Sequence, residues 1–461
     1  MHPIKLVTGS LTTVLALISL PLAITTASDL QLDIPSDPSR YVSQAENWRI
    51  YDSQSNHIWN RLYRSLYARV ARDGRVYGDD QLDPLLWGST KHLLGGPAKR
   101  EALLCLDEFL NTHAERLISD PLKRAMMQRD LWAVFDWTVR RSENPSFEFV
   151  ELQLRLTRVM RRLALTGKQI RDLPRTYDSA VNAKTFSADY DPRHPETAFL
   201  PPDLFQSNGT WVQLNVDAGG PVAPSHVASV SGRSVFRVFI SLPEGRGSTL
   251  AYLKRLSDFP KPWIRNQDDP LEVLPNSQLP EFPVGTRLAL MRQMLVIDQE
   301  GNLVPTGIVE SIQIRVHRII PPGIPKGLDT DSNVARSSLD VNEFKLSRTK
   351  LFAGESGGLR LVAPDEKEFP LFQSHGIDLF EEIAWEPIER NLRPVLGSCA
   401  SCHFRPGVHS VLSRIPSIVL LRVRDVRRNL IPVMNSEYET RSALEWKQSQ
   451  DSWRRLRELW Q

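Results

Sequence analysis

Residues 28–192 carry apolar side chains at the spacing of helices. One stripe repeats every four residues, at Ile58, Leu62, Leu66 and Val70. A second stripe comprises Phe149, Leu152, Leu156, Val159 and Leu163. Between them, Asp120 and Pro121 have the order of an N-cap and a first helical position. The segment they open, 122–139, ends in an apolar run at 131–135 followed by Trp137, which indicates a central, buried helix. The pattern predicts an all-α domain over residues 28–192.

Beyond the helical region the apolar period changes to two, which is typical of strands. The alternating runs are 212–216, 236–242 and 312–317. In the last run Gln313, Arg315 and His317 take the polar positions, so we expect one buried and one solvated face, with His317 at the surface. Residues 298–302 (Asp-Gln-Glu-Gly-Asn) form a turn signal between two strands. The pattern predicts an antiparallel β domain over residues 193–362, sandwich-like in architecture.

The last hundred residues include a predicted terminal helix. Ser436 and Glu439 have the spacing of a capping box. Helix-compatible apolar positions follow at Ala443, Trp446, Trp453, Leu456 and Trp460. We expect this aromatic face to pack on the cysteine-bearing part of residues 363–461. The whole chain is then a multidomain α+β protein: an N-terminal all-α domain, a central antiparallel β domain and a C-terminal segment that ends in this helix.

The N-terminus has the composition of an export signal. A weakly basic start at 1–5 precedes a mostly apolar stretch at 11–24, and small residues follow up to Ala27. An uncleaved membrane anchor is the alternative, but the stretch is short for a span of about 20 residues and contains Pro21. We therefore expect residues 1–27 to be a signal peptide. The mature chain should lie in the periplasm or outside the cell, with no stable membrane span after cleavage.

Overall composition narrows the function classes only slightly. The chain of 461 residues carries 57 Lys and Arg against 54 Asp and Glu, a net charge of +3, which is too mild a balance to indicate nucleic-acid binding. Its 3 cysteines cannot supply a disulfide framework, and Cys105, within an apolar run, is expected to be a buried, inert thiol. The sequence contains no phosphate loop, dinucleotide fingerprint or hydrolase nucleophile motif. A specific function must therefore come from a local motif.

That local motif is Cys399-Ala400-Ser401-Cys402-His403. Two cysteines separated by two residues and followed by histidine form the attachment signature of haem c. The spacing lets both thiols add to the haem vinyl groups as thioethers, while His403 ligates the iron from the proximal side. Covalent attachment of this kind takes place outside the cytoplasm, which agrees with the predicted export.

Through this motif the chain resembles the c-type cytochromes over residues 395–434, and the resemblance implies one covalently bound haem c. In class I cytochromes c a methionine before the last helix completes the iron coordination, and Met434 has that position here. It follows His403 by 31 residues, a shorter separation than in that family, and residues 415–423 have the pattern of a strand where the family has a helix. Separately, residues 128–135 (Gln-Arg-Asp-Leu-Trp-Ala-Val-Phe) resemble secreted bacterial proteins of unknown function, which implies no activity.

Other chemistry fits the same residues. Cys399 and Cys402 alone could form a disulfide or a thiol–disulfide redox pair, although no thioredoxin-like βαβ pattern surrounds them. With His403 and His409 they offer four zinc ligands, but an adjacent cysteine and histidine are poorly placed to share one tetrahedral ion. If haem is bound, His409, His375 or an open iron position are the alternatives to the methionine as sixth ligand.

The sequence thus predicts an exported, monohaem c-type protein that exchanges single electrons with a redox partner protein, the haem being carried by residues 363–461. Two alternatives remain open. A haem enzyme would keep an open distal iron site, whereas a secreted structural or binding subunit would use the cysteines as a disulfide or a zinc site. The helical and β regions are much larger than an electron carrier requires, and either alternative would give these regions a function.

Overall fold

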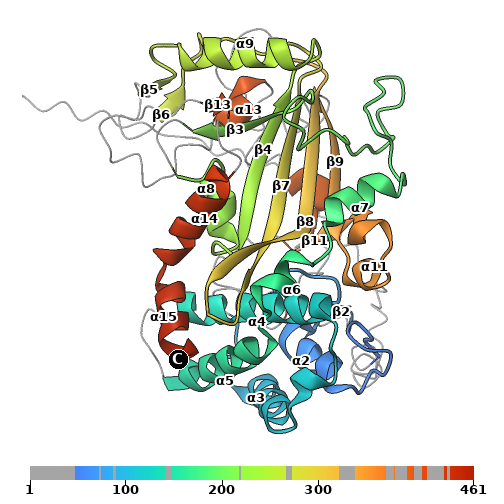
Figure 1. Cartoon of the computed structure of the whole chain (residues 1–461), viewed down its shortest axis with the longest axis vertical. Coiled ribbons are helices and arrows are strands. Elements are labelled where there is room, and N and C mark those ends of the chain that lie inside the picture. The colour runs from blue at the N-terminus through green and yellow to red at the C-terminus, as the bar shows by residue number, and fades with distance from the viewer. Residues whose placement is uncertain are drawn as a thin grey trace, which may run out of the picture. The chain divides into compact units, whose positions relative to one another are not determined.

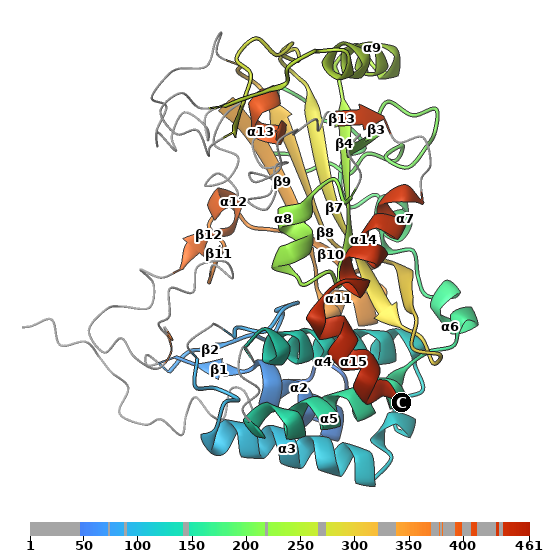
Figure 2. The same cartoon turned by 90° about the vertical axis from the view of Figure 1, so that its left-hand side faces the viewer.

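The computed structural model describes the chain from residue 47 onward, with gaps. The residues described are 47–71, 74–86, 90–141, 147–216, 220–265, 273–320, 338–369, 378, 380, 392–398, 407–412, 430–432 and 437–461. Over these residues the protein is mixed α+β, with a large antiparallel sheet and helices from both ends of the chain (Figures 1 and 2). None of the helices in these ranges is long and apolar enough to cross a membrane. The predicted signal peptide, 1–27, lies outside them.

The first part of the chain is helical, as predicted. Its helices are α2 (Ile58–Tyr67), α3 (Gly96–Asn111), η1 (Ala114–Arg116), α4 (Pro121–Arg141), α5 (Phe147–Leu163), α6 (Gly167–Arg171) and α7 (Thr176–Asn182). The stripes predicted for α2 and α5 are buried within both helices, and Oδ1 of Asp120 accepts the N–H of Leu122 at 2.9 Å where α4 begins. Val70 is the exception: α2 ends at Tyr67, and Val70 lies in strand β1 (Arg69–Val70) with 43% of its surface exposed.

Seven strands form the large sheet, in the order β10-β9-β8-β7-β4-β3-β13, and all neighbours are antiparallel (Figure 1). They are β3 (Val212–Val216), β4 (Ser234–Ser241), β7 (Arg287–Ile297), β8 (Leu303–His317), β9 (Leu339–Leu346), β10 (Leu359–Leu361) and β13 (Leu430–Pro432). The predicted turn joins β7 to β8, with the N–H of Asn302 donating to Oδ1 of Asp298 at 2.7 Å and Gly301 at a φ of +79°. A single large sheet thus replaces the predicted sandwich, and one of its strands comes from beyond residue 362.

Three two-stranded ladders and several further helices complete the described elements. The ladders pair β1 with β2 (Val76–Tyr77), β5 (Trp263–Arg265) with β6 (Val273–Pro275), and β11 (Lys367–Glu368) with β12 (Arg393–Pro394). The helices are α8 (Pro224–Ser229), α9 (Arg246–Ser257), α11 (Arg348–Phe352), η2 (Ser356–Gly358), α12 (Val395–Ser398) and α13 (Val408–Leu412). Since α12 ends directly before the cysteine motif and α13 begins soon after it, described elements flank the motif on both sides.

Both faces of the large sheet are buried, which corrects the prediction of one solvated face. On one face, Val235 and Phe239 belong to a core that is shared with the helical region. On the other face, Phe236 and Ile240 belong to a second core, which includes side chains of α8, α9 and α13. His317, predicted to be at the surface, is fully buried. The alternation identified the strands, but it could not show that chain from another region covers the polar positions.

The predicted terminal helix is in fact two helices, α14 (Tyr438–Gln448) and α15 (Asp451–Trp460). Ser436 lies outside the described residues, and Glu439 caps no helix, because its Oε2 accepts the N–H of Val222 at 3.1 Å. The aromatic face of the helix pair divides between two cores: Trp453 packs against the helical region, with its ring centroid 6.4 Å from that of Trp132, whereas Trp446 packs against the second core. The helix that carries Trp453 and Trp460, α15, packs against both α4 and α5.

Glu439 is a fully buried carboxyl on α14. Its Oε1 has no hydrogen-bond partner among the described residues. Burial raises the pKa of Glu439 to about 7, while the bond from Val222 and the charge of Arg237 oppose this shift. The carboxyl therefore binds its proton near neutral pH, far above the range of an exposed glutamate.

We expect Glu439→Gln to flatten the pH dependence of stability between about pH 4.5 and 7. A carboxyl with a raised pKa binds its proton more tightly in the folded chain, so wild-type stability falls as pH rises through this window. The shift corresponds to a loss of up to about 3 kcal/mol. Glutamine keeps the acceptor for Val222 and carries no charge. Chemical unfolding at pH 5 and pH 8 measures the difference, and an identical pH dependence in the two proteins would contradict the expectation.

Candidate functional site

The residues predicted to bind haem lie outside the described part of the chain. They are Cys399, Cys402, His403 and Met434, as well as His375; of His409 only the backbone, in α13, is described. The structure does place the residues next to the motif on either side. We refer to the contacts of residues 407–408 as the downstream anchor and to those of residues 378–395 as the upstream anchor.

In the downstream anchor, side chains of the sheet region hold the backbone of Gly407 and Val408. The N–H of Gly407 donates to Nδ1 of His317 at 3.2 Å, and the N–H of Val408 donates to Oε1 of Glu281 at 2.6 Å. Gly407 has a φ of +76°, and a Cβ at this position would collide with the Glu281 carboxylate. Val408 is buried in the second core. The chain is thus fixed four residues after His403, and glycine is required there.

His317 is the last residue of β8 and has no exposed surface. Its ring packs edge-on against Phe282, with 4.8 Å between the ring centroids. Burial, together with the charge of Arg315, lowers the pKa of His317 to about 3, so the ring is neutral at physiological pH. Because Nδ1 accepts the N–H of Gly407, the ring proton is on Nε2. This buried N–H has no hydrogen-bond partner among the described residues.

Glu281 forms the other half of the downstream anchor. Its Oε1 accepts a second backbone hydrogen bond, from Phe282 at 2.9 Å. Burial raises the pKa of Glu281, and the two N–H donors oppose that shift. Beside it lies a depression of about 440 Å³, lined also by Leu242, Glu244, Ser248, Ala251, Arg255, Phe282 and Pro283. Glu281 therefore contacts the chain that follows the motif and also borders an open surface.

The upstream anchor ties the chain before the motif to the beginning of the helical region. Nη2 of Arg69 donates to both carboxylate oxygens of Asp378 at 2.9 Å, and the same guanidinium lies 4.5 Å from the ring centroid of Phe380. Arg69 and Asp378 are both buried. Nearer the motif, β12 pairs with β11, and the N–H of Val395 donates to the carbonyl of Glu366 at 2.9 Å. The motif therefore lies between two anchored stretches of chain.

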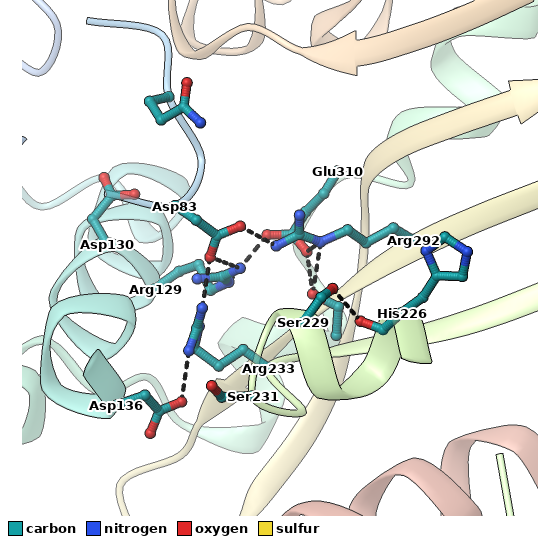
Figure 3. Close-up of polar contacts among 12 residues, drawn as sticks. Asp83, Arg129, Asp130, Asp136, His226, Ser229, Ser231, Arg233, Arg292 and Glu310 are labelled. Atoms are coloured by element: carbon teal, nitrogen blue, oxygen red, sulfur yellow. Dashed lines mark hydrogen bonds and ion pairs between the residues drawn. The ribbon is translucent and has the colours of Figure 1, made fainter. Parts of the chain in front are cut away.

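A buried ion network lies between the helices and the sheet. Figure 3 shows its centre, where Arg129, Arg233 and Arg292 converge on Asp83 at 3.3, 2.6 and 2.8 Å. These arginines come from α4, from the residue before β4 and from β7. Burial alone would raise the pKa of Asp83, but the charges of Arg292, Arg129 and Arg233 hold it well below its usual range. Asp83 is therefore a permanent anion that joins three separate elements.

Two further carboxylates extend the ion network. Glu310 of β8 accepts a hydrogen bond from Nε of Arg292 at 2.9 Å. Asp136 of α4 accepts one from Nη1 of Arg233 and one from Nζ of Lys447, each at 2.7 Å. Lys447, on α14, has no exposed surface, and burial lowers its pKa to about 8. The network thus links α4 and the sheet to the C-terminal helix pair.

Three consecutive residues of α4 make separate contacts on the sheet side. Gln128 exchanges two hydrogen bonds with the backbone of Ile297 at the end of β7, at 2.8 and 2.9 Å. Arg129 enters the ion network, and Asp130 accepts two hydrogen bonds from the guanidinium of Arg348, at the start of α11. We had attached no role to this segment. The signal in the sequence is a polar triplet directly before the apolar run 131–135 of the same helix, because charged residues buried at such positions must be paired.

The ion network is suited to holding elements of the fold together. Each of its carboxylates is paired with at least one cation, which leaves no free general base. Within the described ranges, no three His, Cys, Asp or Glu side chains are grouped so that they could hold a metal ion. Cys105 is buried and its pKa is raised by burial, as expected of an inert thiol. The best candidate for a functional site is therefore the cysteine motif with its two anchors.

The chain matches no protein-family model, no curated protein and no solved structure. A functional assignment must consequently come from the motif and from the chemistry of the residues around it.

Asp83→Asn should lower the free energy of unfolding by about 3–5 kcal/mol, because it leaves three buried arginines around a neutral side chain of nearly the same volume. Lys254→Gln is the control, since it breaks an exposed pair with Asp258 that is worth at most about 1 kcal/mol. Chemical denaturation measures both losses. A loss for the Asp83 variant no larger than that of the control would show that the ion network does not hold the fold together.

Proposed function

We propose that the chain is an exported protein that carries one covalently bound haem c and transfers single electrons. The observation that carries the proposal is the sequence Cys399-Ala400-Ser401-Cys402-His403, in a chain whose first 27 residues have the pattern of a signal peptide. Cys399 and Cys402 hold the haem as thioethers, and His403 is the proximal ligand of the iron. The expected location is the periplasm or the outside of the cell.

Two features of the described residues support a bound group beside the motif. The first is the buried Nε2–H of His317, for which the described residues offer no acceptor. A buried donor left without a partner costs about 1–3 kcal/mol, and an acceptor on a bound group would remove that cost. The second is Gly407, because the chain is anchored there with only residues 404–406 separating it from His403. So short a connection restricts how far the proximal ligand can move.

When bound, haem supplies a one-electron couple between ferric and ferrous iron, which requires no bond to a substrate to form or break. The residues of the chain then have distinct tasks. The cysteines would prevent loss of the haem, and His403 would contribute a nitrogen ligand to its iron. Asp378 and Gly407 attach the motif to the rest of the chain through the two anchors. A redox partner protein supplies the electron or accepts it.

Met434 is our proposal for the sixth ligand. It belongs to the short connection between β13, which ends at Pro432, and α14, which begins at Tyr438. We use the word framework for the large sheet and the helices that the ion network joins to it. Both elements are bonded to this framework: β13 is the edge strand next to β3, and Lys447 of α14 binds Asp136. A thioether in the sixth position gives a higher reduction potential than a second imidazole.

Replacing Cys399 and Cys402 with serine should abolish covalent haem attachment, because the thioethers can no longer form. We would express the full chain in a host with periplasmic haem maturation and stain the denatured, acid-extracted protein for haem. Cys105→Ser is the matched control and should keep all of its haem, since this thiol is buried in α3. A colourless wild-type band in cells that mature a control cytochrome would overturn the proposal, and zinc and thiol content would be measured next.

A further inference from the structure

The buried donor of His317 calls for an acceptor of a particular kind. The imidazole is neutral and already bonded through Nδ1, so its Nε2 carries a proton and cannot be a metal ligand in this state. Arg315 lies two positions earlier, on the same face of β8, and is also buried. Its guanidinium donates to the neutral side chain of Gln313. A buried N–H without a partner favours an oxygen acceptor, and a carboxylate oxygen forms a stronger hydrogen bond than a neutral one.

Two acids of this region accept hydrogen bonds from groups other than His317. Glu281 uses Oε1 for the backbone of Val408 and Phe282. Glu343, which faces Gln313 across β8 and β9, accepts a hydrogen bond from that side chain at 2.9 Å. The anionic oxygen that would suit His317 is therefore expected to arrive with a bound group.

We infer that His317 is a positioning residue for the haem: its Nδ1 fixes the chain at Gly407, and its Nε2–H donates a hydrogen bond to a haem propionate carboxylate. This inference rests on the proposed function. It adds a second contact between the framework and the cofactor, independent of the cysteines. The hydrogen bond compensates negative charge close to the iron, and it thereby raises the reduction potential of the haem.

Two substitutions separate the two tasks of His317. His317→Asn places an amide oxygen near the position of Nδ1, where it can accept the N–H of Gly407, but it has no donor at the position of Nε2. His317→Phe keeps the ring that packs on Phe282 and removes both nitrogens. His226→Asn is the matched control, because His226 is another histidine whose pKa is lowered by burial, on α8 of the same region.

The test measures hydrogen exchange over residues 407–412 in the mature chains, with or without haem, and the reduction potential of the haem in the haem-loaded chains. We expect exchange at Gly407 to stay within about 2-fold of wild type in His317→Asn and to become at least about 5-fold faster in His317→Phe, since one hydrogen bond is lost. We expect a lower potential in both His317 variants and the wild-type potential in His226→Asn.

An unchanged potential in His317→Asn would overturn the contact with the propionate. Unchanged exchange in His317→Phe would overturn the anchor at Gly407. A wild-type chain that matures without covalent haem would overturn the proposed function and the propionate contact together. The exchange comparison needs no haem, so the two failures can be told apart.

Discussion

Asp83 and the three arginines around it form the contact on which the rest of the fold depends. Taking ions out of water costs several kcal/mol each, and that cost is recovered only when every charge keeps its partners. The aspartate follows the first short hairpin, whereas the arginines come from α4, the lead into β4, and β7. These elements cannot separate without leaving unpaired charge in the core. Arg129 reaches the network only if α4 is held in the correct position. The residues on either side of it help to hold α4, because Gln128 bonds to the backbone of Ile297 and Asp130 bonds to Arg348.

The framework continues into the C-terminal region, where the candidate site lies. Lys447 joins α14 to Asp136, and β13 adds an edge strand to the large sheet. On both sides of the cysteine motif, the anchors bond the chain to parts that the ion network holds. For a protein that transfers electrons, a fixed attachment segment keeps the surroundings of the haem constant, and these surroundings set its potential. In this account, the large helical and sheet regions serve as the platform for one short segment.

Local patterns predicted the elements well because each of them depends on near neighbours. The stripe through Leu156 and the alternation around Ile314 needed no knowledge of distant contacts, and the haem motif is itself a local signal. The anchors could not be predicted in the same way. The burial of His317 depends on chain 90 residues away in sequence, and Arg233 meets Asp83 across 150 residues. Polar and apolar residues alternate along a strand in the same way whether water or a later segment covers the polar face. These long-range contacts therefore could not be predicted from the sequence and are seen only in the structure.

Equilibrium unfolding of the mature, haem-loaded chain, followed by haem absorbance and by tryptophan fluorescence, shows whether the anchors make the cysteine motif unfold together with the rest of the chain. The haem reports on the cysteine motif, whereas tryptophan fluorescence sums over the 11 tryptophans of the chain, among them the buried rings of Trp59, Trp132 and Trp453 in the helical region and α15. If the anchors join the motif to the framework, both signals change in a single transition with one midpoint. A haem signal lost at a clearly lower denaturant concentration than the tryptophan signal would contradict the account, because the motif would then unfold separately from the framework.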